Sequence, residues 1–117
     1  MDLFGSGQTG AGGSVVVEST GANTPYAVMA TQEGFVALQA GSVKVQNNPG
    51  AAVAADNGTV ALTSLDANGS GVQVLNNSAV NPTIGALGKG GVTIQAQNSP
   101  IEVLNQANGY AIWADNG

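Results

Sequence analysis

Ionisable side chains are scarce in this chain. Its 117 residues include no histidine, arginine or cysteine, and only 8% are charged, where a typical globular domain has about 25%. Two lysines, Lys44 and Lys89, stand against seven acids and give a net charge of −5. This balance cannot neutralise a run of phosphates, so we expect no nucleic-acid partner. The lack of cysteine excludes both a disulfide framework and a thiolate metal site.

Aromatic residues and long apolar runs are also missing. Hydrophobic residues make up 43% of the chain but aromatic residues only 4%, so the interior must be narrow and built from Val, Ile, Leu and Ala. No apolar run approaches the ~18 residues that a membrane span needs, and the N-terminus has no basic and apolar leader. We therefore expect no membrane partner and synthesis in the cytoplasm.

A short phrase of alternating valines recurs along the chain. Val15, Val43, Val72 and Ile101 follow one another at a nearly constant spacing. Side chains alternate across a strand, so these residues and the valines two positions later point to one side, and the residues between them point to the other. The second inward column contains Val17, Val45, Val74 and Val103.

Two more strands complete each repeat. One follows the pattern Ala/Thr, Val/Ile, any residue, Ala, and the other follows a glycine at Gly34, Gly58 and Gly90. A period of roughly 20 to 50 residues indicates a solenoid, and the frequent Gly and Asn exclude helical repeats. The sequence therefore predicts an all-β parallel β-helix over residues 14–117, with three strands per coil and about four coils. The second-strand segments are 27–30, 52–55, 83–86 and 111–114.

The segment before the repeats, residues 1–13, is rich in glycine and has little to bury. We expect it to be a flexible N-terminal arm. It is either a disordered terminus or a docking arm whose Leu3 and Phe4 insert into a partner.

Two coils carry a resemblance to known proteins. Residues 109–117 (GYAIWADNG) and 51–58 (AAVAADNG) resemble coils of right-handed β-helices in phage fibre, tail-spike and head-decoration proteins and in autotransporter passenger domains. The likeness covers residues 14–117. It implies a short right-handed β-helix on a virion or cell surface, often as a homotrimer. The lack of a signal sequence and membrane barrel departs from the autotransporter pattern.

Few residues suggest chemistry. Asp56 and Asp115 occupy equivalent positions two coils apart, at a separation of ~10 Å that suits an inverting glycosidase pair, although Asp-Asn-Gly is also a tight-turn sequence. Asp66, Asn68 and Ser70 match the opening of a calcium loop, but Asn77 stands where the bidentate glutamate belongs. We expect no catalytic residue, no metal site and no cofactor, and loop geometry is the preferred explanation of both motifs.

Asn47, Asn76 and Asn105 also form a column at the end of the first strand of each coil. Stacked amides at ~4.8 Å can hydrogen-bond to one another along the solenoid axis. Alternatively, Asn stands there only because it suits turns.

Protein contacts are the function that the sequence favours. Alternation places Met29, Leu75, Leu104 and Trp113 outside, with Phe35 beside a turn, and Leu75 and Leu104 share one column. Alternatively, loops of the same chain cover these residues. We expect the last coil to expose unpaired strand edges and bare Val/Ile columns. Neighbouring subunits or a larger assembly would cover this end, unless the chain is truncated. The partner-contact candidates are Leu3, Phe4, Met29, Phe35, Leu75, Leu104 and Trp113.

We therefore predict a structural virion protein, a capsid decoration or fibre protein, that is not an enzyme. Its partners would be capsid or tail proteins and other copies of itself in a trimer. The main alternative is a fragment of a bacterial surface adhesin. A polysaccharide-cleaving spike fragment is less favoured, as is an ice-binding surface on the outward face around Thr63 and Thr93.

Overall fold

The structure is a computed structural model that describes residues 2–4, 13–20, 25–67 and 69–116. The described residues form strands and turns and contain no helix, hence none that could span a membrane. The strands are β1 (Asp2–Phe4), β2 (Ser14–Ser19), β3 (Tyr26–Thr31), β4 (Phe35–Ala40), β5 (Ser42–Asn47), β6 (Ala51–Asp56), β7 (Thr59–Ser64), β8 (Val72–Asn76), β9 (Ile84–Leu87), β10 (Gly91–Ala96), β11 (Ile101–Asn105) and β12 (Ile112–Asp115).

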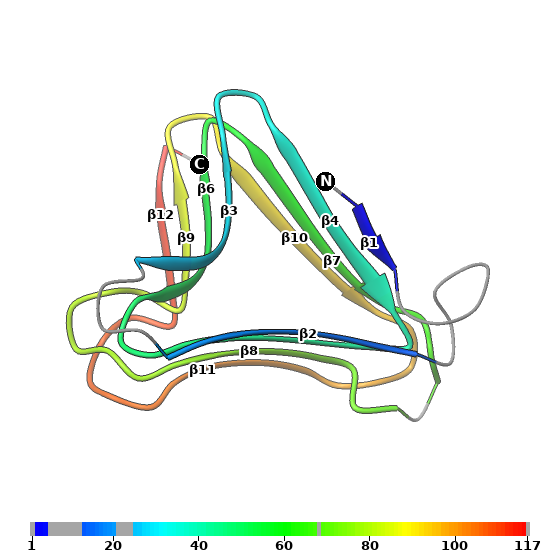
Figure 1. Ribbon diagram of the computed structural model, residues 1–117. Coiled ribbons are helices and arrows are strands. Elements are labelled where there is room, and N and C mark those ends of the chain that lie inside the picture. The colour runs from blue at the N-terminus through cyan, green and yellow to red at the C-terminus, as the bar shows by residue number, and fades with distance from the viewer. Residues whose placement is uncertain (1, 5–12, 21–24, 68, 117) are drawn as a thin grey trace.

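The strands form three parallel sheets that make the sides of a triangle (Figure 1). Sheet A has the order β1-β4-β7-β10, sheet B the order β11-β8-β5-β2 and sheet C the order β12-β9-β6-β3. The chain visits sheets B, C and A in turn, so the predicted parallel solenoid with three strands per coil is confirmed. Where about four coils were expected, the structure has about three full turns, from β2 to β10, followed by β11 and β12.

The register of sheet B matches the predicted columns. Val15 pairs with Val43, Val43 with Val72 and Val72 with Ile101, and the second valine column is aligned in the same way. Parallel pairing of equivalent strands stacks like side chains at ~4.8 Å, and a shift of one residue would turn every valine outward. The nearly constant repeat length in this part of the coil therefore determines the register.

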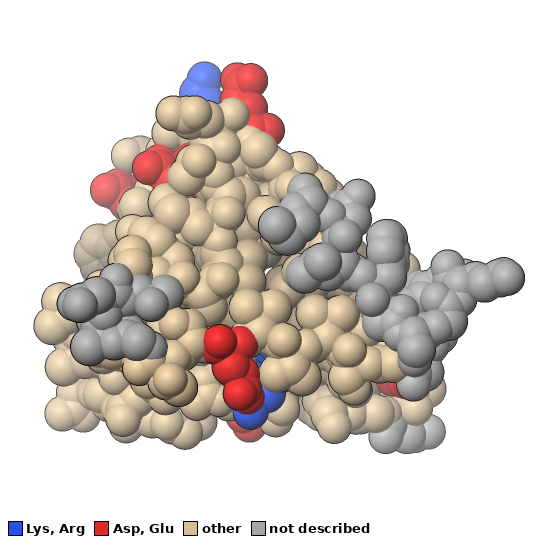
Figure 2. Space-filling view, in the orientation of Figure 1, with Lys and Arg blue, Asp and Glu red and all other residues tan. Residues whose placement is uncertain are grey.

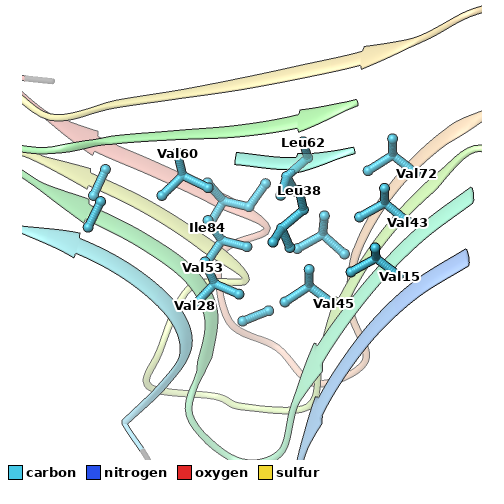
Figure 3. Close-up of a cluster of buried hydrophobic side chains, with 14 of the residues drawn as sticks. Val15, Val28, Leu38, Val43, Val45, Val53, Val60, Leu62, Val72 and Ile84 are labelled. Atoms are coloured by element: carbon cyan, nitrogen blue, oxygen red, sulfur yellow. The ribbon is translucent and has the colours of Figure 1, made fainter. Parts of the chain in front are cut away.

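The core fills the inside of the triangle with small branched side chains from all three sheets (Figure 3). Leu38 and Leu62 of sheet A meet Val43, Val45 and Val53 of the other two sheets there. Together with the valines and alanines around them they form one buried cluster, which agrees with the narrow, ring-poor interior expected from the composition.

Leu62 lies at the centre of this cluster and has no exposed surface. We expect Leu62→Ala to lower the free energy of unfolding by about 3 kcal/mol, because it removes buried methyl groups and leaves a cavity. Ile94 stands in the same column in β10 but is partly exposed, so Ile94→Ala should cost only about 1 kcal/mol. Urea denaturation followed by circular dichroism measures both, and equal costs would contradict this description of the core.

The recurrent glycines lie at the corner between sheets C and A, where the chain passes close to the preceding coil. A Cβ on Gly58 would stand 2.6 Å from the carbonyl carbon of Ala30, and one on Gly90 would stand 2.4 Å from the backbone oxygen of Ala55. Backbone atoms cannot yield as a flexible side chain does. Glycine therefore recurs at this corner because the backbones of successive coils pack closely there.

The N-terminal segment contributes a strand that the sequence did not predict. Asp2–Phe4 forms β1 and pairs in parallel with β4, aligning Leu3 with Leu38 and Phe4 with Gln39. The outer edge of β4 offers free backbone groups, and pairing them needs no apolar periodicity. Asp2–Phe4 lies within the expected arm over residues 1–13, of which residues 5–12 lie outside the described part of the chain.

Candidate interaction surfaces

The predicted outer leucine pair lies on sheet B. Leu104 pairs with Leu75 in the parallel register, and Leu75 pairs with Gln46, so the two leucines are neighbours on the outer face. Leu75 is half-buried and Leu104 is 43% exposed. The predicted adjacency is confirmed, and the pair forms an apolar patch at one end of a column that continues through Gln46 to Glu18.

Trp113 lies on the outside of sheet C in a column of small residues. It pairs with Gly85, and the same column continues through Ala54 to Met29. Ala54 is buried although alternation directs it outward, and Met29 is half-buried. Met29 and Trp113 thus lie at opposite ends of one outward-facing column, as predicted. Ala54, in the middle of this column, is buried.

A second aromatic residue, Tyr110, accompanies Trp113. Their ring centroids are 5.1 Å apart at an interplanar angle of 52°, within the range that aromatic pairs prefer. Tyr110 is 64% exposed and Trp113 44%. The sequence analysis missed Tyr110, because it precedes the strand and belongs to no repeated column.

The remaining contact candidates are on sheet A. Phe35 begins β4, pairs with Thr59 and is 52% exposed. Leu3 and Phe4 belong to β1, whose backbone alone is described. These three residues are far in sequence from the leucine and aromatic patches, and they belong to a different side of the triangle.

Side-chain hydrogen bonds of Asn76 and Asn105 stabilise the corner between sheets B and C. The Asn76 amide donates to the backbone oxygens of Gly50, Asn81 and Pro82 at 3.1–3.2 Å and accepts a 2.6 Å hydrogen bond from Thr83 Oγ1. Asn105 accepts from the Ser78 backbone and donates to it, at 3.2 and 2.8 Å. These amide hydrogen bonds go to turns and to Thr83 rather than to a ladder of amides, which supports the turn alternative.

The two equivalent aspartates each make a hydrogen bond within their own turn. Asp56 and Asp115 each pair with Leu87, which stands between them, so they lie two strands apart as expected. Asp56 Oδ1 accepts a 2.9 Å hydrogen bond from the side chain of Asn57, and Asp115 Oδ1 accepts one of 3.1 Å from Asn116. Each carboxylate thus stabilises its own turn.

The calcium-loop motif also has a local structural role. Asp66 is half-buried and its carboxylate packs over Gly41, where a Cβ would collide with it. Asn68 lies outside the described residues. In the part of the chain that the structure describes, no three acidic, histidine or cysteine side chains gather as a metal site would require.

The surface is poor in charge. Figure 2 shows a face that is mostly uncharged, with acidic and basic atoms gathered in a few places. One such place is the ion pair between Lys44 Nζ and Glu18 Oε1 of neighbouring strands, at 3.1 Å. An exposed pair of this kind contributes little to stability.

The last coil differs from the others in the exposure of its inward columns. Ile101 is 49% exposed and Ile112 is 63% exposed, whereas Val72 and Ile84, one coil earlier in the same columns, are 0% and 3% exposed. The expected bare columns at this end are confirmed. At the opposite end Val15 is 9% exposed and Val17 is half-buried, so among the described residues the inward columns are more exposed at the end formed by β10, β11 and β12.

Two hollows open beside these columns. One has a volume of about 290 Å³ and apolar walls from sheets C and A. The other, of about 540 Å³, lies at the corner between sheets A and B and mixes apolar with polar walls, including Ser64 and Gln97. Lining residues of the first are Ile84, Ala86, Gly91, Val92, Ile94, Ile112 and Ala114.

No family model, curated protein or solved structure matches this chain. The fold and these surfaces are therefore the basis on which its function is proposed.

Proposed function

We propose that this chain is a structural protein that works through protein–protein contacts. The observation that carries the proposal is the exposure of Ile101 and Ile112, which stand in columns that are buried in the preceding coils of the solenoid. Exposed core columns with unpaired strand edges favour association with another β-structure. The outer patches at Leu75 and Leu104 and at Tyr110 and Trp113 offer further apolar contact area on a surface with little charge.

The setting that we propose is a virion, with the chain as a capsid decoration or fibre protein bound to capsid or tail proteins. Support for this setting comes from the likeness of residues 51–58 and 109–117 to coils of phage structural proteins. The amide-rich, cysteine-free surface is compatible with wide packing between subunits. The homotrimer implied by the same likeness stays a prediction, and it is the alternative to the dimer proposed below.

A bacterial adhesin fragment is the second candidate. The observation that favours it is the same exposed edge, because in a longer β-helix the next coil would pair with β10, β11 and β12. The two settings differ in the length of the polypeptide that contains the chain.

Mass spectrometry and immunoblotting of the source cells and of particles released from them distinguish these functions. The virion proposal predicts that the polypeptide containing this sequence copurifies with particles in fixed proportion to the shell or tail protein. An adhesin would place the sequence in a much longer polypeptide on the cell surface. Finding the sequence only in the particle-free cell fraction would overturn the virion setting.

A further inference from the structure

The end formed by β10, β11 and β12 matches a second copy of itself. We propose that two copies of this chain dock through these ends about a two-fold axis, pairing β11 with β11 of the partner and β10 with β12 of the partner. This inference rests on the proposed role in protein contacts and adds the partner, a second copy. It also adds the strand pairs that form the contact.

The first argument is which end is available. At the opposite end the inward residues Val15, Val28 and Ala30 are at most 9% exposed, and β1 adds a further strand to sheet A. A head-to-tail stack would set the exposed columns of one copy against residues that are already mostly buried in the other. When two such ends dock against each other, the exposed columns of both copies are buried. No exposed end of this kind is left, so the assembly is a dimer.

The second argument is shape. Successive coils are separated by the ~4.8 Å strand spacing, and sharing this rise equally among three sides makes consecutive sides differ in height by ~1.6 Å. In chain order, β10 is therefore the low step, β11 the middle step and β12 the high step of the end. A two-fold axis through the middle of sheet B and the opposite corner places low against high and middle against middle. All three gaps then have the same width.

The third argument concerns the free backbone groups. Alternate residues of a strand bond to opposite neighbours, and the bonds from Val72 N–H to the Pro100 oxygen and from Gln106 N–H to the Asn76 oxygen direct those groups toward β8. The N–H and C=O of Ile101 and Val103 therefore face the open edge. A two-fold axis reverses the strand direction, so β11 and the partner's β11 would pair antiparallel, centred on Val103.

The fourth argument is charge. Centring on Val103 sets Glu102 of one copy opposite Leu104 of the other, so the two acidic side chains are not placed face to face. The contact would also cover the exposed Ile101 and Ile112 side chains of both copies.

Cross-linking tests the strand pairs directly, because the chain contains no cysteine of its own. In a dimer of Val103→Cys, the introduced cysteine of one copy would stand opposite that of the other copy. Their Cα atoms would be ~5.5 Å apart, a separation that allows a disulfide. We expect mild oxidation of purified Val103→Cys to give mostly covalent dimer. Val80→Cys, on a loop residue that is 88% exposed, should stay mostly monomeric under the same conditions.

Sedimentation analysis of Ile112→Lys gives a second measurement that does not need a disulfide. The side chain is 63% exposed within one chain, so the variant should fold with an unchanged circular dichroism spectrum. We expect its dimer dissociation constant to rise at least tenfold, while the matched control Val80→Lys leaves it unchanged.

The results separate this inference from the proposed function. A monomeric wild-type chain at tens of micromolar would overturn docking between copies, and copurification with particles would still decide the virion proposal. An oligomer, including a trimer, that neither cross-links through Val103→Cys nor weakens in Ile112→Lys would place the contact on an outer face and overturn docking through the ends.

Discussion

Replacing Asn76 by leucine should destabilise the fold more than any other polar substitution described here. Asn76 is completely buried, and its amide satisfies the oxygens of Gly50, Asn81 and Pro82 as well as the hydroxyl of Thr83. Each buried group left without a partner costs about 1–3 kcal/mol. We expect Asn76→Leu to lower the free energy of unfolding by about 4 kcal/mol, measured by urea denaturation.

The control for this prediction is the next residue. Asn77 is exposed, so Asn77→Leu should change the free energy of unfolding by no more than about 0.5 kcal/mol. Asn105→Leu should fall between the two, because Asn105 makes the same kind of turn contacts but is only partly buried. Similar losses in all three variants would show that the amide contacts do not fasten the corner.

Gly71→Ala should strongly destabilise the fold, because Gly71 has both the closest backbone neighbour and a left-handed conformation among the described glycines compared. Gly71 has a φ of +73°, and a Cβ there would stand 1.8 Å from the carbonyl oxygen of Pro100. That oxygen accepts the 3.0 Å hydrogen bond from Val72 N–H, which joins β8 to the last coil. Both the backbone conformation and the pairing must change, so we expect a loss of at least about 4 kcal/mol or failure to fold.

Gly91→Ala is the matched comparison on the neighbouring sheet. A Cβ on Gly91 meets nothing within 4 Å, and its φ is not in the left-handed region. The substitution should change stability by less than about 1 kcal/mol and with stabilising sign, because alanine restricts the unfolded chain. Thermal unfolding monitored by circular dichroism distinguishes the two variants, and equal melting temperatures would contradict the geometry described for Gly71.

The sequence predicted the columns of the solenoid well. The valines of sheet B recur at a nearly constant interval and alternate with polar residues, and both signals are local properties of a strand. Stacking equivalent strands then required no further information, so the pairing of Val43 with Val72 and of Leu75 with Leu104 followed. The exposure of the last coil followed from the same reasoning.

Contacts at the corners were harder to predict. The turns differ in length between coils, and the backbone oxygens that meet Asn76 come from two of these turns, through Gly50 and Asn81. Tyr110 and Trp113 would lie on opposite faces of a regular strand, and they meet because the chain bends before β12. β1 was missed because so short a strand carries no period.

The molar mass of the untagged chain in solution tests the central claim most directly. Multi-angle light scattering at tens of micromolar should give twice the single-chain mass of 11.4 kDa, with a shift toward the single-chain value on dilution. A single monomeric species at these concentrations would contradict the claim that the end formed by β10, β11 and β12 is a docking surface for a second copy.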